Sequence, residues 1–222
     1  SMHSYYSREF NDYEYSNCYV ITKEDIQSSE YNNYDGFFFR PYVPGRGPEG
    51  DIEGDPYDAN STLDIHSVRL LWQDAEQPIE HVELVQGFIR IRLDSRTTAD
   101  NIKSGNAIIA AYDKDSNIVW TWHIWVCDSI KDVTISGVTF LDRNIGAVWA
   151  PSSQDQVNSG EEALKTYGLY YQWGRKDPSP GPMSYNYNFI DMRTATYYAF
   201  DAVRNDVSLV TMVGNAPTIA DG

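Results

Sequence analysis

The sequence is short of long apolar runs and of basic residues, and each shortage argues against a class of protein. No apolar run approaches the roughly 20 residues of a membrane-spanning helix, so we expect no span in this chain. Lys and Arg total 17 against 32 Asp and Glu, which gives a net charge of −15. Phosphate would be repelled by such a protein, so nucleic acid is not an expected partner. Partners should be neutral, cationic or bridged by a cation.

Known catalytic and zinc-binding motifs are also missing. The sequence has no GxSxG elbow, P-loop or GxGxxG motif, and its four histidines show neither HExxH nor Cys/His ligand spacing. Paired carboxylates of a glycosidase leave no linear motif, and nothing here favours them. The residues alone therefore give no sign of a catalytic site. His123, between tryptophans in an apolar run, is interpreted as a hydrogen-bonded core histidine.

Cysteine is scarce, and the two that occur leave a question open. Cys18 and Cys127 lack CxxC spacing, so they are compatible with one long-range disulfide or with two buried free thiols. The residues alone favour neither. The chain begins Ser1, Met2, His3 without a charged and apolar leader, so we expect a trimmed chain from which the native signal segment is absent.

A β-hairpin is the clearest feature that is present. Apolar runs at 107–112 and 118–127 flank five turn-forming residues at 113–117. With a period of two, one face of the second run carries Trp120, Trp122, Ile124 and Val126, and the other carries Val119, Thr121, His123, Trp125 and Cys127. Such a strand belongs in the middle of a sheet that is covered on both sides. The three tryptophans are therefore interpreted as core rather than as sugar-stacking platforms.

Further strand signals precede the hairpin. They lie at residues 17–21, 36–40, 67–72, 79–85 and 87–93. We expect the first two to be neighbours. With the hairpin, they give seven short strands over about 110 residues, which is typical of an antiparallel β-sandwich. Residues 41–61, rich in Pro, Gly and acid, are predicted to be a long surface loop.

The pattern changes after Cys127. A polar join at 128–135 precedes a strand-like stretch at 138–141, and Ser159 caps a short helix that ends near Gly168. An aromatic strand is predicted at 168–177, followed by a rigid turn. The fold class is thus mainly β: an irregular arm at 1–13, a β-sandwich at 14–129, and a smaller, irregular α+β domain at 130–222 that we expect to be truncated.

Two acidic segments are candidate calcium sites. Asp113, Asp115 and Asn117 begin like a calcium loop, but Ile118 and Ile124 stand where Gly and a bidentate Glu are needed, so this is a hairpin turn. The better candidate is the acidic loop formed by Asp51, Glu53, Asp55 and Asp58. Four crowded carboxylates would gain from a hard cation, although a water-facing loop is the interpretation we favour. No other cofactor is expected.

Three stretches together resemble a family of Bacteroidetes cell-surface proteins. They are NCYVI at 17–21, GNAIIAAYDKDSNIVWTWHIWVCD at 105–128, and FLDRNIGA at 140–147 with GLYYQWGRKDP at 168–178. Similar segments occur, in this order, in fimbrillin-like proteins and lipoproteins that carry the major paralogous domain. The acidic insertion at 41–58 departs from that pattern.

The resemblance implies a location and two alternative functions. It implies a secreted protein at the outer-membrane surface that is not an enzyme, with no catalytic residues to transfer. The first function is a fimbrial or adhesin-like tip or accessory subunit that mediates attachment or assembly with other surface or pilus subunits. The alternative is a carbohydrate-binding surface module of a polysaccharide-use system that binds host or bacterial glycans. Its candidate ligand-binding residues are Trp149, Tyr170 and Trp173, and Trp149 is the better exposed candidate because it stands in a loop-like context beside Ala150 and Pro151. An extracellular, oxidising setting also favours the Cys18–Cys127 disulfide.

Overall fold

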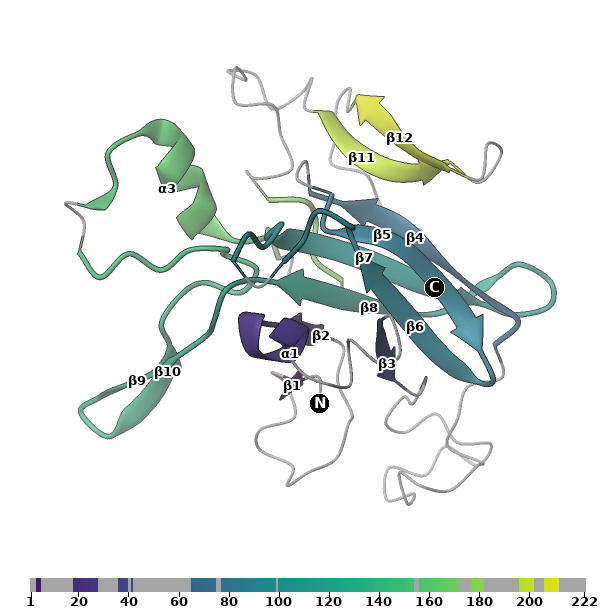
Figure 1. Cartoon of the computed structure of the whole chain (residues 1–222), viewed down its shortest axis with the longest axis horizontal. Coiled ribbons are helices and arrows are strands. Elements are labelled where there is room, and N and C mark those ends of the chain that lie inside the picture. Colours follow the sequence, from purple (N-terminus) through teal and green to yellow (C-terminus); the bar gives the residue numbers. More distant parts are fainter. Residues whose placement is uncertain are drawn as a thin grey trace.

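The protein is mainly β, and two sheets packed face to face form its core (Figure 1). The structure is a computed structural model. It describes residues 3–4, 18–27, 36–39, 41, 65–74, 77–98, 100–153, 156–171, 177–181, 196–201 and 206–211. The sandwich predicted from the strand spacing is confirmed by this arrangement.

The larger sheet has the order β1-β2-β8-β7-β4-β11-β12. Its strands are β1 (His3–Ser4), β2 (Cys18–Ile21), β4 (Ser67–Gln73), β7 (Gly105–Tyr112), β8 (Ile118–Val126), β11 (Thr196–Asp201) and β12 (Asp206–Thr211). Its pairs are antiparallel except β2 with β8, which run parallel. The smaller sheet, β3-β6-β5, is antiparallel and holds β3 (Phe37–Phe39), β5 (Ile79–Val85) and β6 (Phe88–Leu93).

The predicted hairpin is confirmed as the centre of the larger sheet. Strands β7 and β8 pair along their length. The carboxylate of Asp113 closes the turn by accepting hydrogen bonds from the backbone N–H groups of Asp115 and Asn117 at 2.8 and 2.9 Å. Both faces of β8 are buried, since Trp122 and Trp125 point to opposite sides and neither is exposed. Asp113 thus serves this turn as an acceptor of its backbone hydrogen bonds.

The core between the sheets explains why β2 and β3 are not neighbours. The ring of Phe39 in β3 lies 4.3 Å from that of Tyr19 in β2 and 5.4 Å from that of Trp122 in β8, measured between centroids. The two strands thus belong to opposite sheets and meet across the core. The prediction that they pair is wrong, because their aromatic side chains supply facing halves of one interface rather than one surface.

The outer face of the larger sheet is covered by the chain that follows β8. Cys18, Val20, Trp125 and Cys127 form a second buried cluster, against which Ile130 and Ile145 pack. The parallel register pairs Cys18 with His123, four residues before Cys127. Four residues of strand span about 13 Å, whereas a disulfide needs Cα atoms within about 7 Å. The predicted disulfide is therefore wrong, and both cysteines are buried free thiols.

Shorter elements complete the described chain. They are α1 (Lys23–Gln27), the antiparallel hairpin of β9 (Asp132–Ile135) and β10 (Val138–Leu141), and α3 (Gly160–Tyr167). The helix signals are confirmed: the Ser159 hydroxyl accepts from the N–H of Glu162 at 3.1 Å, and Gly168 is the C-cap. None of the described helices is long and apolar enough to cross a membrane.

The structure differs from two further predictions for the chain after residue 127, the polar join at 128–135 and the aromatic strand at 168–177. The polar join at 128–135 contains strand β9. In the predicted aromatic strand, only an isolated bridge between Tyr170 and Ser179 is found, and residues 172–176 lie outside the described chain. Strand β11 pairs with β4, so the hairpin of β11 and β12 extends the sandwich sheet. The domain boundary near Ile130 stays a prediction.

Candidate binding site

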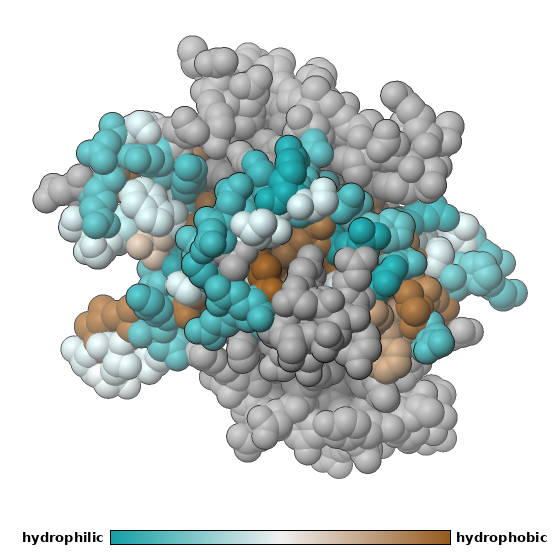
Figure 2. Space-filling view, in the orientation of Figure 1, coloured by the Kyte–Doolittle hydropathy of each residue, from teal (hydrophilic) through white to brown (hydrophobic). Residues whose placement is uncertain are grey.

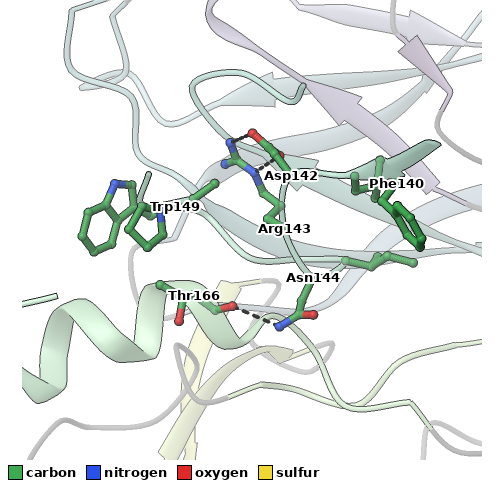
Figure 3. A pocket seen from close by; sticks show the side chains of 10 residues that line it. Phe140, Asp142, Arg143, Asn144, Trp149 and Thr166 are labelled. Atoms are coloured by element: carbon green, nitrogen blue, oxygen red, sulfur yellow. Dashed lines mark hydrogen bonds and ion pairs between the residues drawn. The ribbon is translucent and has the colours of Figure 1, made fainter. Parts of the chain in front are cut away.

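An open pocket of about 650 Å³ lies where strand β10 ends beside the end of α3 (Figure 3). It is built from the end of β10, the loop that follows, and the last turn of the helix. The lining residues are Phe140, Leu141, Asp142, Arg143, Asn144, Ile145, Trp149, Ala150, Pro151 and Thr166. The pocket thus includes the FLDRNIGA stretch and Trp149, the aromatic residue that the sequence singled out.

Aromatic rings stand at two ends of this pocket. Figure 3 shows Trp149 on one side and Phe140 on the other, with the polar residues between them. Trp149 is partly exposed, and 52% of Phe140 is exposed. Ring faces that water can reach are available for stacking on an apolar surface of a ligand.

One wall carries an ion pair between two adjacent residues, Asp142 and Arg143. The Arg143 guanidinium binds the Asp142 carboxylate through Nε to Oδ1 at 2.8 Å and Nη2 to Oδ2 at 2.9 Å. Burial opposes ionisation of Asp142, but hydrogen bonding and charge from Arg143 outweigh it, so the pKa of Asp142 is lowered. Only 7% of the Arg143 side chain is exposed. Because both groups stay charged and paired, the guanidinium is committed to Asp142 rather than to an acidic ligand.

The opposite wall offers uncharged polar groups. The exposed amide of Asn144 donates through Nδ2 to the Thr166 carbonyl oxygen at 3.3 Å, as Figure 3 shows. The Thr166 hydroxyl donates to the carbonyl of Ala163 at 2.8 Å. An amide has a second donor hydrogen and an acceptor oxygen, and a hydroxyl also accepts. This wall therefore suits hydroxyl groups better than ions.

Backbone hydrogen bonds place Trp149 against the helix. The N–H groups of Val148 and Trp149 both donate to the carbonyl of Lys165, at 3.0 and 3.1 Å. The N–H of Leu169 donates to the carbonyl of Ile145 at 3.1 Å. The last carbonyls of a helix have no partner within it, so the loop satisfies one of them. The same bonds fix the backbone position from which the indole ring extends.

Two glycines allow this close approach of loop and helix end. A Cβ on Gly168 would lie 2.4 Å from the carbonyl oxygen of Ile145, and one on Gly146 would lie 2.6 Å from Cγ of Leu169. Both have positive φ, +75° and +85°. Gly146 belongs to the FLDRNIGA stretch and Gly168 to the GLYYQWGRKDP stretch. At both positions a larger residue would clash with its neighbours and strain the backbone, which explains why each stretch has a glycine there.

A buried polar network connects the pocket loop to the sandwich. Nδ2 of Asn106 donates to the carbonyl of Gly146 at 2.8 Å and to Oδ2 of Asp74 at 2.7 Å. Its Oδ1 therefore accepts from Nε2 of His123 at 2.9 Å, which leaves Nδ1 of His123 to accept from the Cys18 thiol at 3.1 Å. All four side chains are buried. The network joins all three motif stretches of the sequence.

The network holds groups in place and has little chemical reactivity of its own. Burial lowers the pKa of His123 to about 3. Burial, and to a lesser extent the charge of Cys127, raises the pKa of Cys18. At neutral pH the pair is therefore a thiol and an uncharged imidazole, not the thiolate and imidazolium of a reactive cysteine. His123 is the hydrogen-bonded core histidine that the sequence predicted.

The predicted site residues have separate outcomes. Trp149 lines the pocket, while Tyr170, at 45% exposure, is on the surface and does not line it. Trp173 lies outside the described residues, as do the calcium candidates Asp51, Glu53, Asp55 and Asp58. Across the part of the chain that is described, no three His, Cys, Asp or Glu side chains are placed to hold a metal ion. The calcium site stays a prediction.

Several site residues were not singled out from the sequence. Asp142, Arg143, Asn144 and Thr166 carry no linear signal beyond the motif that contains three of them. Asn106 did have a signal, because a polar residue at the start of a fully apolar run must find hydrogen-bond partners when the strand is buried.

No protein-family model, no curated protein and no solved structure matches this chain. The family resemblance of the motif stretches stays a prediction, and the geometry of the pocket is the evidence for a function.

Proposed function

We propose that this chain is a non-enzymatic, adhesin-like protein of a bacterial cell surface, and that its pocket binds a carbohydrate. The observation that carries the proposal is the accessible ring of Trp149 beside uncharged hydrogen-bonding groups. A pyranose has an apolar face that stacks on an aromatic ring and hydroxyls at its rim that need donors and acceptors. Trp149 supplies the first, and Asn144 and Thr166 supply the second.

The size and openness of the pocket support a glycan as the ligand. A volume of about 650 Å³ lies in the range of ligand sites. An open site can hold one or two sugar units of a longer chain while the rest extends into solvent. Attachment to a surface polysaccharide needs this kind of access.

The charges of the pocket support binding rather than hydrolysis. Glycoside hydrolysis uses two carboxyl groups that face the scissile bond. Among the described residues that line the pocket, Asp142 alone carries a carboxylate, and Arg143 occupies it. The net charge of −15 repels acidic glycans, and Arg143 is already paired with Asp142. Both features favour neutral over acidic glycans.

A glycan array with matched variants tests this proposal. We expect the wild-type chain to bind a defined set of neutral glycans, and Trp149→Ala to weaken that binding at least tenfold. The control is Tyr167→Ala, because Tyr167 is 56% exposed on α3 and does not line the pocket. Binding by Trp149→Ala equal to wild type, or no glycan bound at all, would contradict the proposal.

A second candidate function is assembly with other proteins of the cell surface, as a fimbrial or pilus subunit. The observation that favours it is the exposed apolar side of the β9–β10 hairpin, where Ile135 is 60% exposed and Val138 is 54% exposed. Copurification with a defined pilus subunit, lost on changing these residues, would support this candidate.

A further inference from the structure

The β9–β10 hairpin carries an apolar face that is open to solvent. Register pairs Val133 with Phe140 and Ile135 with Val138, so these four side chains share one side. They are 39%, 52%, 60% and 54% exposed, respectively. We call these four residues the apolar face. The opposite side holds the pair Thr134 and Thr139, whose hydroxyl oxygens lie 3.2 Å apart.

Local sequence specifies this hairpin. Ser136 and Gly137 form its two-residue turn, with φ values of 52° and 81°. Positive φ at both central residues matches the right-handed twist of paired strands. A two-stranded hairpin is nevertheless marginally stable in water on its own. Covering the apolar face would therefore stabilise an element that is already formed.

The hairpin is well placed to meet another molecule. Figure 1 shows it projecting at the lower left, away from the two sheets, and Figure 2 shows a hydrophobic patch at the same place. Contiguous apolar surface that is rimmed by polar residues marks an interaction site. A projecting hairpin can reach a partner while the body of the protein stays at a distance.

Charge indicates which partner fits. Residues 131–141 contain one basic and one acidic residue, Lys131 and Asp132, and so are neutral overall in a chain of net charge −15. The apolar face itself holds neither charge nor amide, so it offers no group by which a charged partner would be selected. Interfaces of homodimers are the more apolar class, and a two-fold contact uses the same patch on both copies.

We propose that the apolar face binds the same face of a second copy of this chain about a two-fold axis. At the hairpin, two acidic copies can touch without bringing charge together, and its projection keeps the charged bodies apart. Four side chains per copy bury less than the roughly 1,200 Å² of a stable interface, so the dimer is weak and reversible.

This contact would also affect attachment at the pocket. Phe140 belongs both to the apolar face and to the pocket lining. A second copy seated on the apolar face covers Phe140 but brings two pockets into one assembly, and Trp149, Asn144 and Thr166, which are not part of the apolar face, stay available to a ligand. Two linked sites bind a repeating polymer more tightly than either site does alone. The self-association itself does not depend on what the pocket binds.

Sedimentation velocity of the full chain over a range of protein and salt concentrations tests the proposal. We expect a monomer–dimer equilibrium that strengthens with salt, because screening reduces the repulsion between copies. Ile135→Glu should leave a monomer at all concentrations. Thr134→Glu adds the same charge to the opposite side of the same strand and should still form the dimer, as a control for charge.

Three outcomes would overturn the proposal. The first is a wild-type chain that is monomeric at its highest soluble concentration, and the second is an Ile135→Glu variant that dimerises like wild type. The third is a wild-type chain that stays monomeric and sediments with phosphatidylcholine vesicles, while Ile135→Glu does not sediment with them. The last would assign the apolar face to a lipid surface. The uncharged variant Val138→Ser, which should weaken the dimer at least fivefold, guards against an effect of added charge alone.

Discussion

Asn106 is the residue through which the sandwich holds the pocket loop. Its side chain has four hydrogen-bonding positions, and bonds to Gly146, Asp74 and His123 use at least three of them. Each partner is buried or lies in the buried backbone, so water does not compete for these bonds. His123 is the titratable member of the network whose protonation would break the pattern.

Stability should depend on pH through His123. Its pKa is about 3 in the folded chain and about 6.5 when unfolded. Between these values the unfolded state binds a proton that the folded state does not, so folding stability falls as pH falls from 6.5 towards 3. The expected slope from this one group is about 1.4 kcal/mol per pH unit.

Urea unfolding between pH 4 and pH 7 measures that slope. His123→Gln should lose this part of the pH dependence, whatever its stability at pH 7. His66→Gln should keep it, because His66 is exposed. An unchanged slope in His123→Gln would contradict the role given to the buried imidazole.

The cysteines should react only after unfolding. Both thiols are buried, and burial raises the pKa of Cys127 to about 12. Thiolate is the reactive form, so a thiol reagent should label neither cysteine quickly in the folded chain. Without prior reduction, the unfolded chain should show two free thiols. A count of zero would show that the disulfide excluded by the strand register does form.

At the scale of elements, the sequence predicts those helices and hairpins that are determined by residues close together in the chain. The β7–β8 hairpin follows from two apolar runs, at 107–112 and 118–127, on either side of an Asp-rich turn, and α3 follows from Ser159 and Gly168 at its ends. The pairing of β2 with β8 could not be derived in this way. Cys18 and His123 lie 105 residues apart, and their contact depends on which apolar faces pack together rather than on any local pattern.

The pocket was only partly predictable for the same reason. Trp149 was recognised because a tryptophan beside Ala150 and Pro151 belongs to a loop. The residues around it come from β10, the following loop and α3, and their meeting depends on two glycines that permit close backbone contact. Strand β9 was missed because it has only four residues. Its alternation of Val133 and Ile135 with Asp132 and Thr134 is too short to stand out beside the polar residues that precede it.

Gly168→Ala should test that close contact. The new Cβ would meet the Ile145 carbonyl at 2.4 Å and should destabilise the fold beyond the backbone strain of positive φ. Gly87→Ala is the matched control, since Gly87 has φ +83° and nothing within 4 Å of its Cβ position. We expect a further loss of about 1–3 kcal/mol for Gly168→Ala, measured by thermal or urea unfolding. Equal losses in the two variants would contradict the tight junction.

At the scale of the whole molecule, the pocket is held from two sides. The sandwich fixes its loop through Asn106, and the end of α3 fixes it through the Lys165 carbonyl. The Thr121 hydroxyl in β8 also donates to the carboxylate of Asp177, which follows the GLYYQWGRK stretch. A site held in this way needs little rearrangement to bind, which favours affinity for a weakly held ligand such as a sugar.

The most direct measurement is a titration of the ¹⁵N-labelled chain with the neutral oligosaccharide that binds best on the array, followed through the indole N–H signals. Trp149→Phe identifies the signal of Trp149. The account predicts that this signal shifts and saturates with the ligand, while those of the buried Trp72, Trp122 and Trp125 stay in place. Saturable binding that leaves the Trp149 signal unmoved would contradict the assignment of the pocket as the carbohydrate site.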